Sequence, residues 1–202
     1  MDLTRVVAMV LVVLDHAVIE VPPLAERATS DVRWWVAEAL LAISRLAVPL
    51  FIMVSGALLL DPGRTEPVAE FARRRLQRVA VPLLVWALAY LTFRKDVLAE
   101  PLTGEGAVDD LASGDPYYHL YYLYIALGLY ALTPFLRRLI GAVDRRTIMM
   151  LCGTAFALGI GDQFLRTVLQ VGSSNGLTYF VDYVGFYLAG WLLRDVRLRR
   201  AR

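Results

Sequence analysis

The chain has 202 residues, of which 58% are hydrophobic, and a formal net charge of only +2. An ordinary globular domain is about half apolar, and here the excess is gathered in six blocks separated by short charged segments. This distribution argues against a soluble domain and indicates membrane-spanning helices, while the single cysteine excludes an intramolecular disulfide.

In chain order, the apolar blocks predict an all-α, polytopic helix bundle that forms a single membrane domain over residues 1–202. Six transmembrane helices are expected, over 4–23, 34–60, 79–94, 117–137, 147–164 and 177–193. A helix needs ~20 residues to cross the hydrocarbon layer, so the third and fifth spans are short and their flanking arginines are expected to snorkel. The alternative, a soluble helical bundle, is disfavoured by residues 46–60, which include no ionisable side chain.

Prolines and tyrosines lie at defined positions within these spans. Pro49 is expected to kink the second span beside Ser55 and Gly56, where helices can approach closely. Pro82 is expected in the first turn of the third span, where its missing N–H costs nothing. Four tyrosines at the outer end of the fourth span resemble an interfacial aromatic belt, namely Tyr117, Tyr118, Tyr121 and Tyr122.

Charge alternates between the segments that connect the spans. Three segments are rich in arginine: 61–78, 137–146 and the tail after Leu193. The longest of the others, 95–116, carries six acidic residues against the single basic Lys95. Because positive loops stay in the cytoplasm, both termini are expected inside the cell and 95–116 outside.

The first span carries four ionisable residues, although a central Asp or Arg costs about 2.5–3.5 kcal/mol on insertion scales. Arg5 and His16 are eleven residues apart, which is about 1100° of rotation and within about 20° of whole turns. Both are therefore expected on one helix face, with Arg5 at the cytoplasmic mouth and His16 about 16 Å deeper. Glu20, one turn beyond, is close enough to orient or charge His16. The plain alternative is that Arg5 only snorkels and His16 only makes a helix contact.

Other ionisable residues in the spans need partners or water. Arg45, near the middle of the second span, is a candidate partner for Asp15. His119 lies near the outer end of the fourth span, where an interfacial hydrogen bond is its simplest role. Asp162 and Arg166 are expected to pair. The chain has two histidines and no suitable cysteine grouping, so no metal site is expected.

Four stretches in order resemble the acyltransferase-3 family of bacterial membrane O-acyltransferases. They are residues 2–16, 44–56, 71–82 and 119–134. The family's first helix carries an arginine, ten intervening residues and a histidine, as Arg5 and His16 do here. The third stretch is similar to the family's basic cytoplasmic segment, including an Arg-x-Arg at Arg73 and Arg75. Taken alone, that arginine run is more typical of a membrane anchor or an anionic-lipid contact.

The resemblance implies an enzyme of the bacterial inner membrane that moves an acyl group, most often acetyl. The donor would be cytoplasmic acyl-CoA, as a substrate rather than a bound cofactor, and the acceptor a hydroxyl of a cell-surface carbohydrate or glycolipid. Arg73 and Arg75 would meet the donor's phosphates, since the planar guanidinium suits bidentate phosphate contacts. Arg5 would hold the donor, and His16 would act as general base or transient acyl acceptor.

The remaining candidates have supporting roles in this scheme. His119 would lie nearer the acceptor, and Glu20 and Arg45 would support the site. Membrane lipids are expected partners and nucleic acids are not.

The rival is a non-enzymatic membrane protein. In a small transporter, the polar residues of the first two spans would form a proton or ion pathway. An inactive truncated fragment is the other possibility, because family members usually have several more spans than six. A complementary C-terminal half or a second copy would then complete the bundle.

Overall fold

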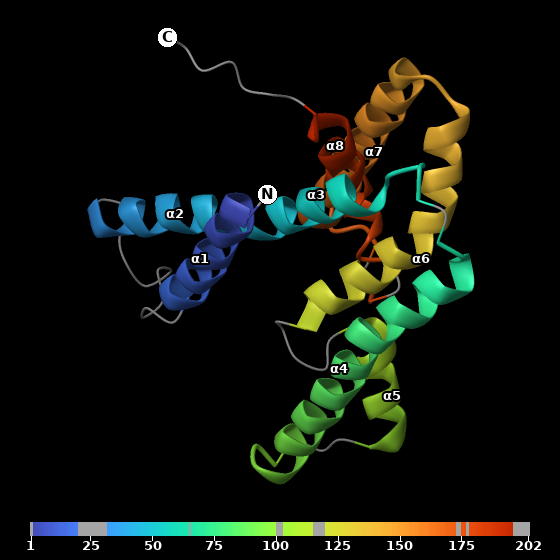
Figure 1. Cartoon of the computed structure of the whole chain (residues 1–202). Coiled ribbons are helices and arrows are strands. Elements are labelled where there is room, and N and C mark those ends of the chain that lie inside the picture. The colour runs from blue at the N-terminus through green and yellow to red at the C-terminus, as the bar shows by residue number, and fades with distance from the viewer. Residues whose placement is uncertain are drawn as a thin grey trace.

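The computed structural model describes residues 2–19, 32–64, 66–99, 103–114, 120–172, 175–176 and 178–195. Within these ranges the regular structure is entirely helical, which confirms the all-α class (Figure 1). The elements are α1 (Asp2–Ile19), α2 (Val32–Ser44), α3 (Ala47–Leu59), α4 (Val68–Asp96), α5 (Gly104–Ser113), α6 (Tyr121–Ala142), α7 (Arg145–Thr167), the 3-10 turn η3 (Val181–Tyr183) and α8 (Val184–Leu193).

Four helices of the described part are long and apolar enough to cross a membrane. They are Val32–Leu59, which comprises α2 and α3, together with α4, α6 and α7. The expected first span corresponds to α1, whose 18 residues include Arg5 and Asp15, and the expected sixth span to η3 and the ten-residue α8. Six spans and the orientation of the termini therefore remain predictions.

The second span is interrupted rather than smoothly kinked. Its two halves, α2 and α3, are separated by a turn at Arg45 and Leu46, and Pro49 is the third residue of α3. Proline has no N–H for the carbonyl four residues earlier, and its ring crowds that carbonyl, which here belongs to Arg45. The break therefore falls one turn before the proline that causes it.

The third span and the basic segment form one helix. The prediction that Pro82 lies in the first turn of this helix is wrong, because α4 begins at Val68 and runs through Pro82; the membrane bounds 79–94 stay a prediction. The run between them consists mainly of Arg, Leu, Gln, Val and Ala, several of which are strong helix formers, so nothing in it stops the helix.

A short helix, α5, lies within the acidic 95–116 segment. Its N-terminus is capped by Thr103, whose hydroxyl accepts from the Gly106 N–H at 3.1 Å. Its C-terminus ends at Gly114, whose φ of 83° is the left-handed conformation that glycine adopts readily. Arg94 of α4 holds α5 through an ion pair to Asp110 at 2.8 Å. The Thr and Gly signals in the sequence would have found this helix.

The closest helix packing joins α3 to α8. A Cβ added at Gly56 would overlap the carbonyl oxygen of Tyr187, and one added at Gly190 would overlap that of Met53. The contact is thus reciprocal, with a glycine on each helix facing the other backbone, as small residues allow in membrane helix pairs. Around it lies the largest hydrophobic core, formed by buried residues of α3, α6, α7 and α8. The close approach expected at Gly56 is confirmed.

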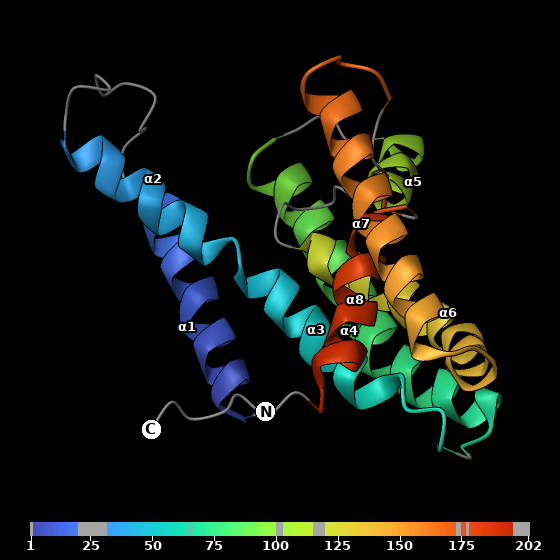
Figure 2. The same cartoon turned by 90° about the horizontal axis from the view of Figure 1, so that it is seen from above.

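The arginine-rich connecting segments and the acidic 95–116 segment lie at opposite ends of the helix bundle. At one end, Arg145 donates to the Leu192 carbonyl at 2.8 Å, and Arg194 pairs with Asp61 at 3.6 Å. This basic end joins the three arginine-rich segments. At the other end, the Gly176 N–H donates to the Ser113 carbonyl, so that α5 meets the segment after α7. Figure 2 shows α5 and the end of α7 on the opposite side from the start of α1 and α4.

Candidate functional site

A large cavity among the described residues lies where α1, the break in the second span, the start of α6 and η3 meet. This central cavity has a volume of about 990 Å³. It is lined by Met9, Val12, Val13, Asp15, His16, Ser44, Arg45, Ala47, Val48, Phe51, Tyr121, Tyr122 and Tyr183. Non-helical backbone at membrane depth is tolerated where it faces protein or a water-filled space. The break at Arg45 and Leu46 therefore lies where such a space is present.

His16 lines the central cavity from α1. Its Nδ1 lies 2.8 Å from the carbonyl oxygen of Val12, one turn earlier in the same helix. A carbonyl oxygen only accepts, so Nδ1 must carry the proton in this contact. In the neutral ring the basic nitrogen is then Nε2. The contact with Val12 thus favours the tautomer in which Nε2 is the basic nitrogen.

Asp15 is held by the second span. Ser44, which is 1% exposed, donates its hydroxyl to the Asp15 Oδ1 at 2.6 Å and also to the Leu41 carbonyl at 2.9 Å. Asp15 was expected to pair with Arg45; among the described residues its hydrogen bond goes instead to the neighbouring Ser44, while Arg45 lines the cavity. The serine is a site residue that the sequence interpretation missed, although it stands next to Arg45.

Arg5 lies on the same continuous helix as His16. The cavity-lining residues Met9, Val12 and His16 follow it at helical spacing, and Arg5 itself is one turn before Met9, outside the lining. The structure therefore places Arg5 below the central cavity rather than in its wall. Two other candidates, Glu20 and His119, lie outside the described residues.

Arg73 and Arg75 point away from each other. Two residues correspond to about 200° of helix rotation, so the side chains leave α4 on different faces. Arg73 is exposed, whereas Arg75 is half-buried with its guanidinium 5.5 Å from the ring centres of Phe71 and Tyr130. Between them in sequence, Arg74 is paired with Glu66 and Glu70.

Arg75 converges instead with Arg137 of α6, which sequence interpretation did not single out. The Arg137 guanidinium lies 4.6 Å from the Phe71 ring centre, so one aromatic ring faces both arginines. Arg137 is 9% exposed and donates Nε–H to the Leu59 carbonyl at 2.6 Å, at the C-terminal end of α3. Its Nη2 is buried with no hydrogen-bond partner among the described residues.

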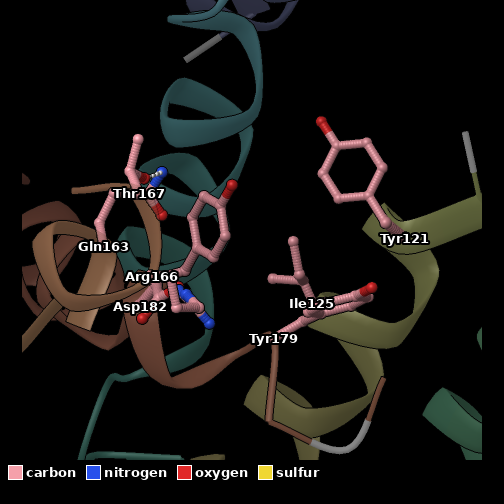
Figure 3. A pocket seen from close by; sticks show the side chains of 8 residues that line it. Tyr121, Ile125, Gln163, Arg166, Thr167, Tyr179 and Asp182 are labelled. Atoms are coloured by element: carbon pink, nitrogen blue, oxygen red, sulfur yellow. Dashed lines mark hydrogen bonds and ion pairs between the residues drawn. The ribbon is translucent and has the colours of Figure 1, made fainter. Parts of the chain in front are cut away.

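A second, smaller cavity lies beside the central one, toward the end that carries α5. This α7 cavity has a volume of about 380 Å³ and is lined by Tyr121, Ile125, Gln163, Arg166, Thr167, Tyr179, Asp182 and Tyr183. Figure 3 shows Gln163, Arg166, Thr167 and Asp182 on one side and Tyr121 on the other. The expected pair of Asp162 and Arg166 is confirmed at 2.6 Å, and Asp182 joins it at 2.5 Å.

A histidine and an aspartate on the wall of a mainly apolar and aromatic cavity, within a helix bundle with candidate membrane spans, are compatible with a membrane enzyme or a transporter. The family comparison adds the class of the domain. A family model described as an acyltransferase domain matches residues 1–202, and the chain belongs to this acyltransferase family. Comparisons with curated proteins and with solved structures returned no match.

Proposed function

We propose that this chain transfers an acyl group, acetyl in the simplest case, from cytoplasmic acyl-CoA to a hydroxyl of a cell-surface carbohydrate or glycolipid. The observation that supports this most is the position of His16, with Nδ1 held by Val12 and the ring on the wall of a large cavity. The membership of the acyltransferase family supplies the reaction class.

His16 acts as the general base in this proposal. Its Nε2 accepts the proton of the acceptor hydroxyl as the oxygen attacks the thioester carbonyl. A C–O bond forms, the C–S bond breaks, and the CoA thiolate leaves and takes up a proton. In the variant route the imidazole itself first receives the acyl group and then passes it to the hydroxyl.

The donor is held at the basic end. Arg75 and Arg5 are the residues proposed to meet it, Arg75 through the phosphates and Arg5 below the cavity mouth. Of the two arginines expected to meet the donor's phosphates, Arg73 is the weaker candidate, because its side chain leaves α4 on a different face from that of Arg75. A charge-assisted hydrogen bond to phosphate contributes about 1.5–3 kcal/mol, so Arg75→Ala should weaken CoA binding roughly ten-fold or more and Arg73→Ala less.

The test uses the full chain in lipid nanodiscs, with acyl-CoA and a panel of sugars, followed by mass spectrometry of products. His16→Ala should abolish product formation, with unfolding curves and CoA binding unchanged. The matched control is His16→Gln, which keeps a polar side chain but cannot take the proton. Full turnover in either variant contradicts the role of His16.

The rival proposal is a proton-coupled transporter. It is favoured by Asp15, His16 and Arg45 lining one cavity, as ionisable residues do along transport pathways. Uptake of a solute driven by a pH gradient in proteoliposomes, without consumption of acyl-CoA, would establish it in place of the transferase.

A further inference from the structure

The α7 cavity and the central cavity share two walls. Tyr121 of α6 and Tyr183 of η3 line both. The two cavities are therefore adjacent, with these two tyrosines between them. We infer that the α7 cavity binds the acyl acceptor, and that the acceptor it selects is an uncharged polyhydroxyl compound, such as a neutral sugar. This inference rests on the proposed function.

The charges of the cavity argue against an anionic acceptor. Among the described residues that line it, the cationic side chain is Arg166, which is paired with two carboxylates, at 2.6 Å to Asp162 and at 2.5 Å to Asp182. One guanidinium against two carboxylates leaves an excess of negative charge. Arg166 and Asp182 are 20% and 26% exposed, so this charge is only partly screened by solvent. A phosphate or a sugar acid would meet repulsion here, and a neutral molecule would not.

The other lining groups suit hydroxyl groups. Gln163 donates one N–H to the Thr167 hydroxyl at 3.2 Å, and a carboxamide has a second N–H and an acceptor oxygen as well. Asp182 offers carboxylate acceptors, and tyrosines combine a flat apolar ring with a phenolic hydroxyl. Such alternation of donors, acceptors and aromatic faces matches a sugar ring, which has hydroxyls at its rim and C–H groups on its faces. The volume of about 380 Å³ is within the range of small-molecule sites.

A purely structural role predicts something different. The ion pair between Arg166 and Asp182 joins α7 to η3. Gly159 of α7 also packs closely on the Asp182 backbone, because a Cβ added at Gly159 would lie 3.2 Å from the Asp182 carbonyl oxygen. If joining these two elements were the whole function, the cavity would have no ligand selectivity. Binding measurements separate the two roles without any need for catalysis.

The experiment measures sugar binding to the full chain in nanodiscs of zwitterionic lipid, by saturation-transfer difference NMR. The probes are methyl glucoside, N-acetylglucosamine, glucuronic acid and glucose 6-phosphate. The two neutral sugars should show saturable binding and the two anions should not. Gln163→Ala should weaken neutral-sugar binding by about five- to ten-fold, as for one or two lost hydrogen bonds. Gln77→Ala, at an exposed position of α4, is the matched control and should change nothing.

A charge change provides the sharper test. Asp162→Asn keeps the Arg166 pair with Asp182 and removes the excess negative charge, so glucuronic acid binding should rise while neutral-sugar binding persists. Equal binding of neutral and anionic sugars, or no effect of Gln163→Ala, would overturn the inference. Sugar binding without acyl transfer would thus refute the proposed function alone, and acyl transfer without selective binding would refute this inference alone.

Discussion

Two regions of the molecule differ in how closely their helices pack: the contact between α3 and α8, and the first helix, α1. At α3 and α8, glycines bring the backbones into contact and the surrounding side chains are buried. On α1, by contrast, Leu3, Val6 and Val10, outside the lining of the central cavity, are each at least 55% exposed, and Ala8 is buried. Figure 2 shows α1 beside α2, and α1 also contacts α3, the helix that packs on α8.

The difference separates the scaffold from the chemistry. Close interhelical packing fixes α3, and α3 continues through the break into α2. The side chains proposed for catalysis are on α1, and among the described residues Ser44 links α1 to that scaffold through its hydrogen bond to Asp15. In a bilayer the exposed apolar face of α1 contacts lipid, which provides no hydrophobic force between helices. Small polar contacts should therefore matter more for the position of α1 than for the core.

The largest effect is expected at the glycine contact. Gly56→Ala places a methyl group on the Tyr187 carbonyl, which is backbone and cannot rotate away. A loss of about 3 kcal/mol or more in the free energy of unfolding is expected, because overpacking here forces the helices apart. Thermal unfolding in detergent measures it. Gly153→Ala on α7, where an added Cβ meets nothing within 4 Å, is the control and should be neutral or slightly stabilising. Equal stability of the two variants would contradict the contact.

The second effect is expected at Arg137. Arg137→Ala removes a buried side chain and leaves the Leu59 carbonyl without this donor, which should cost about 2 kcal/mol. The neighbouring Arg138 is exposed, and Arg138→Ala should change stability by less than about 0.5 kcal/mol. Chemical denaturation of both variants in the same detergent tests this difference. If Arg138→Ala were the more damaging, the assignment of Arg137 to the scaffold would be wrong.

Much of the scaffold could be predicted from the sequence because apolar blocks and prolines are local signals. The helices near 79–94, 117–137 and 147–164 were expected and found, and Gly56 was recognised as a close approach. The position of the break was missed by one turn because proline acts on the carbonyl four residues before it.

The site was less predictable because it depends on side chains that meet from distant elements. Helical spacing places Arg5 and His16 on one helix, but spacing alone cannot reveal that Ser44 holds Asp15 or that Arg75 faces Arg137. It also cannot show that Arg73 and Arg75 diverge unless the continuous helix is recognised first. Tyr121 of α6 and Tyr183 of η3 are far apart in the sequence and meet only in the folded chain.

At Ser44 a smaller loss of stability is expected than at Arg137, together with a larger loss of acyl transfer. Ser44→Ala removes the hydrogen bond to Asp15 and should cost about 1–1.5 kcal/mol, since one partner is a carboxylate. If α1 depends on this contact, acyl transfer should fall by more than the loss of folded protein explains. The control is Ser55→Ala, which lies on α3 outside the cavity lining. Cross-linking between cysteines introduced in α1 and α2 reports the position of α1 directly. Unchanged cross-linking and turnover would show that other contacts fix α1.

The smallest effect is expected at the start of α7, where stabilisation is local. Asp144 caps this helix: its carboxylate accepts from the Thr147 hydroxyl and from the Thr147 N–H, the latter at 3.1 Å. These two hydrogen bonds lower the pKa of Asp144 below its ordinary value of 3.8. Because the folded pKa is the lower one, the contribution is present above the unfolded pKa and is lost as pH falls through the folded pKa. Asp144→Ala should therefore lower the Tm slightly at pH 7, with a difference from the wild type that shrinks as pH falls below about 4. Asp109→Ala, at an exposed position within α5, should show no comparable pH dependence. A Tm difference as large as that of Gly56→Ala would mean that helix capping rivals interhelical packing in this bundle, and the distinction between scaffold and local contacts would fail.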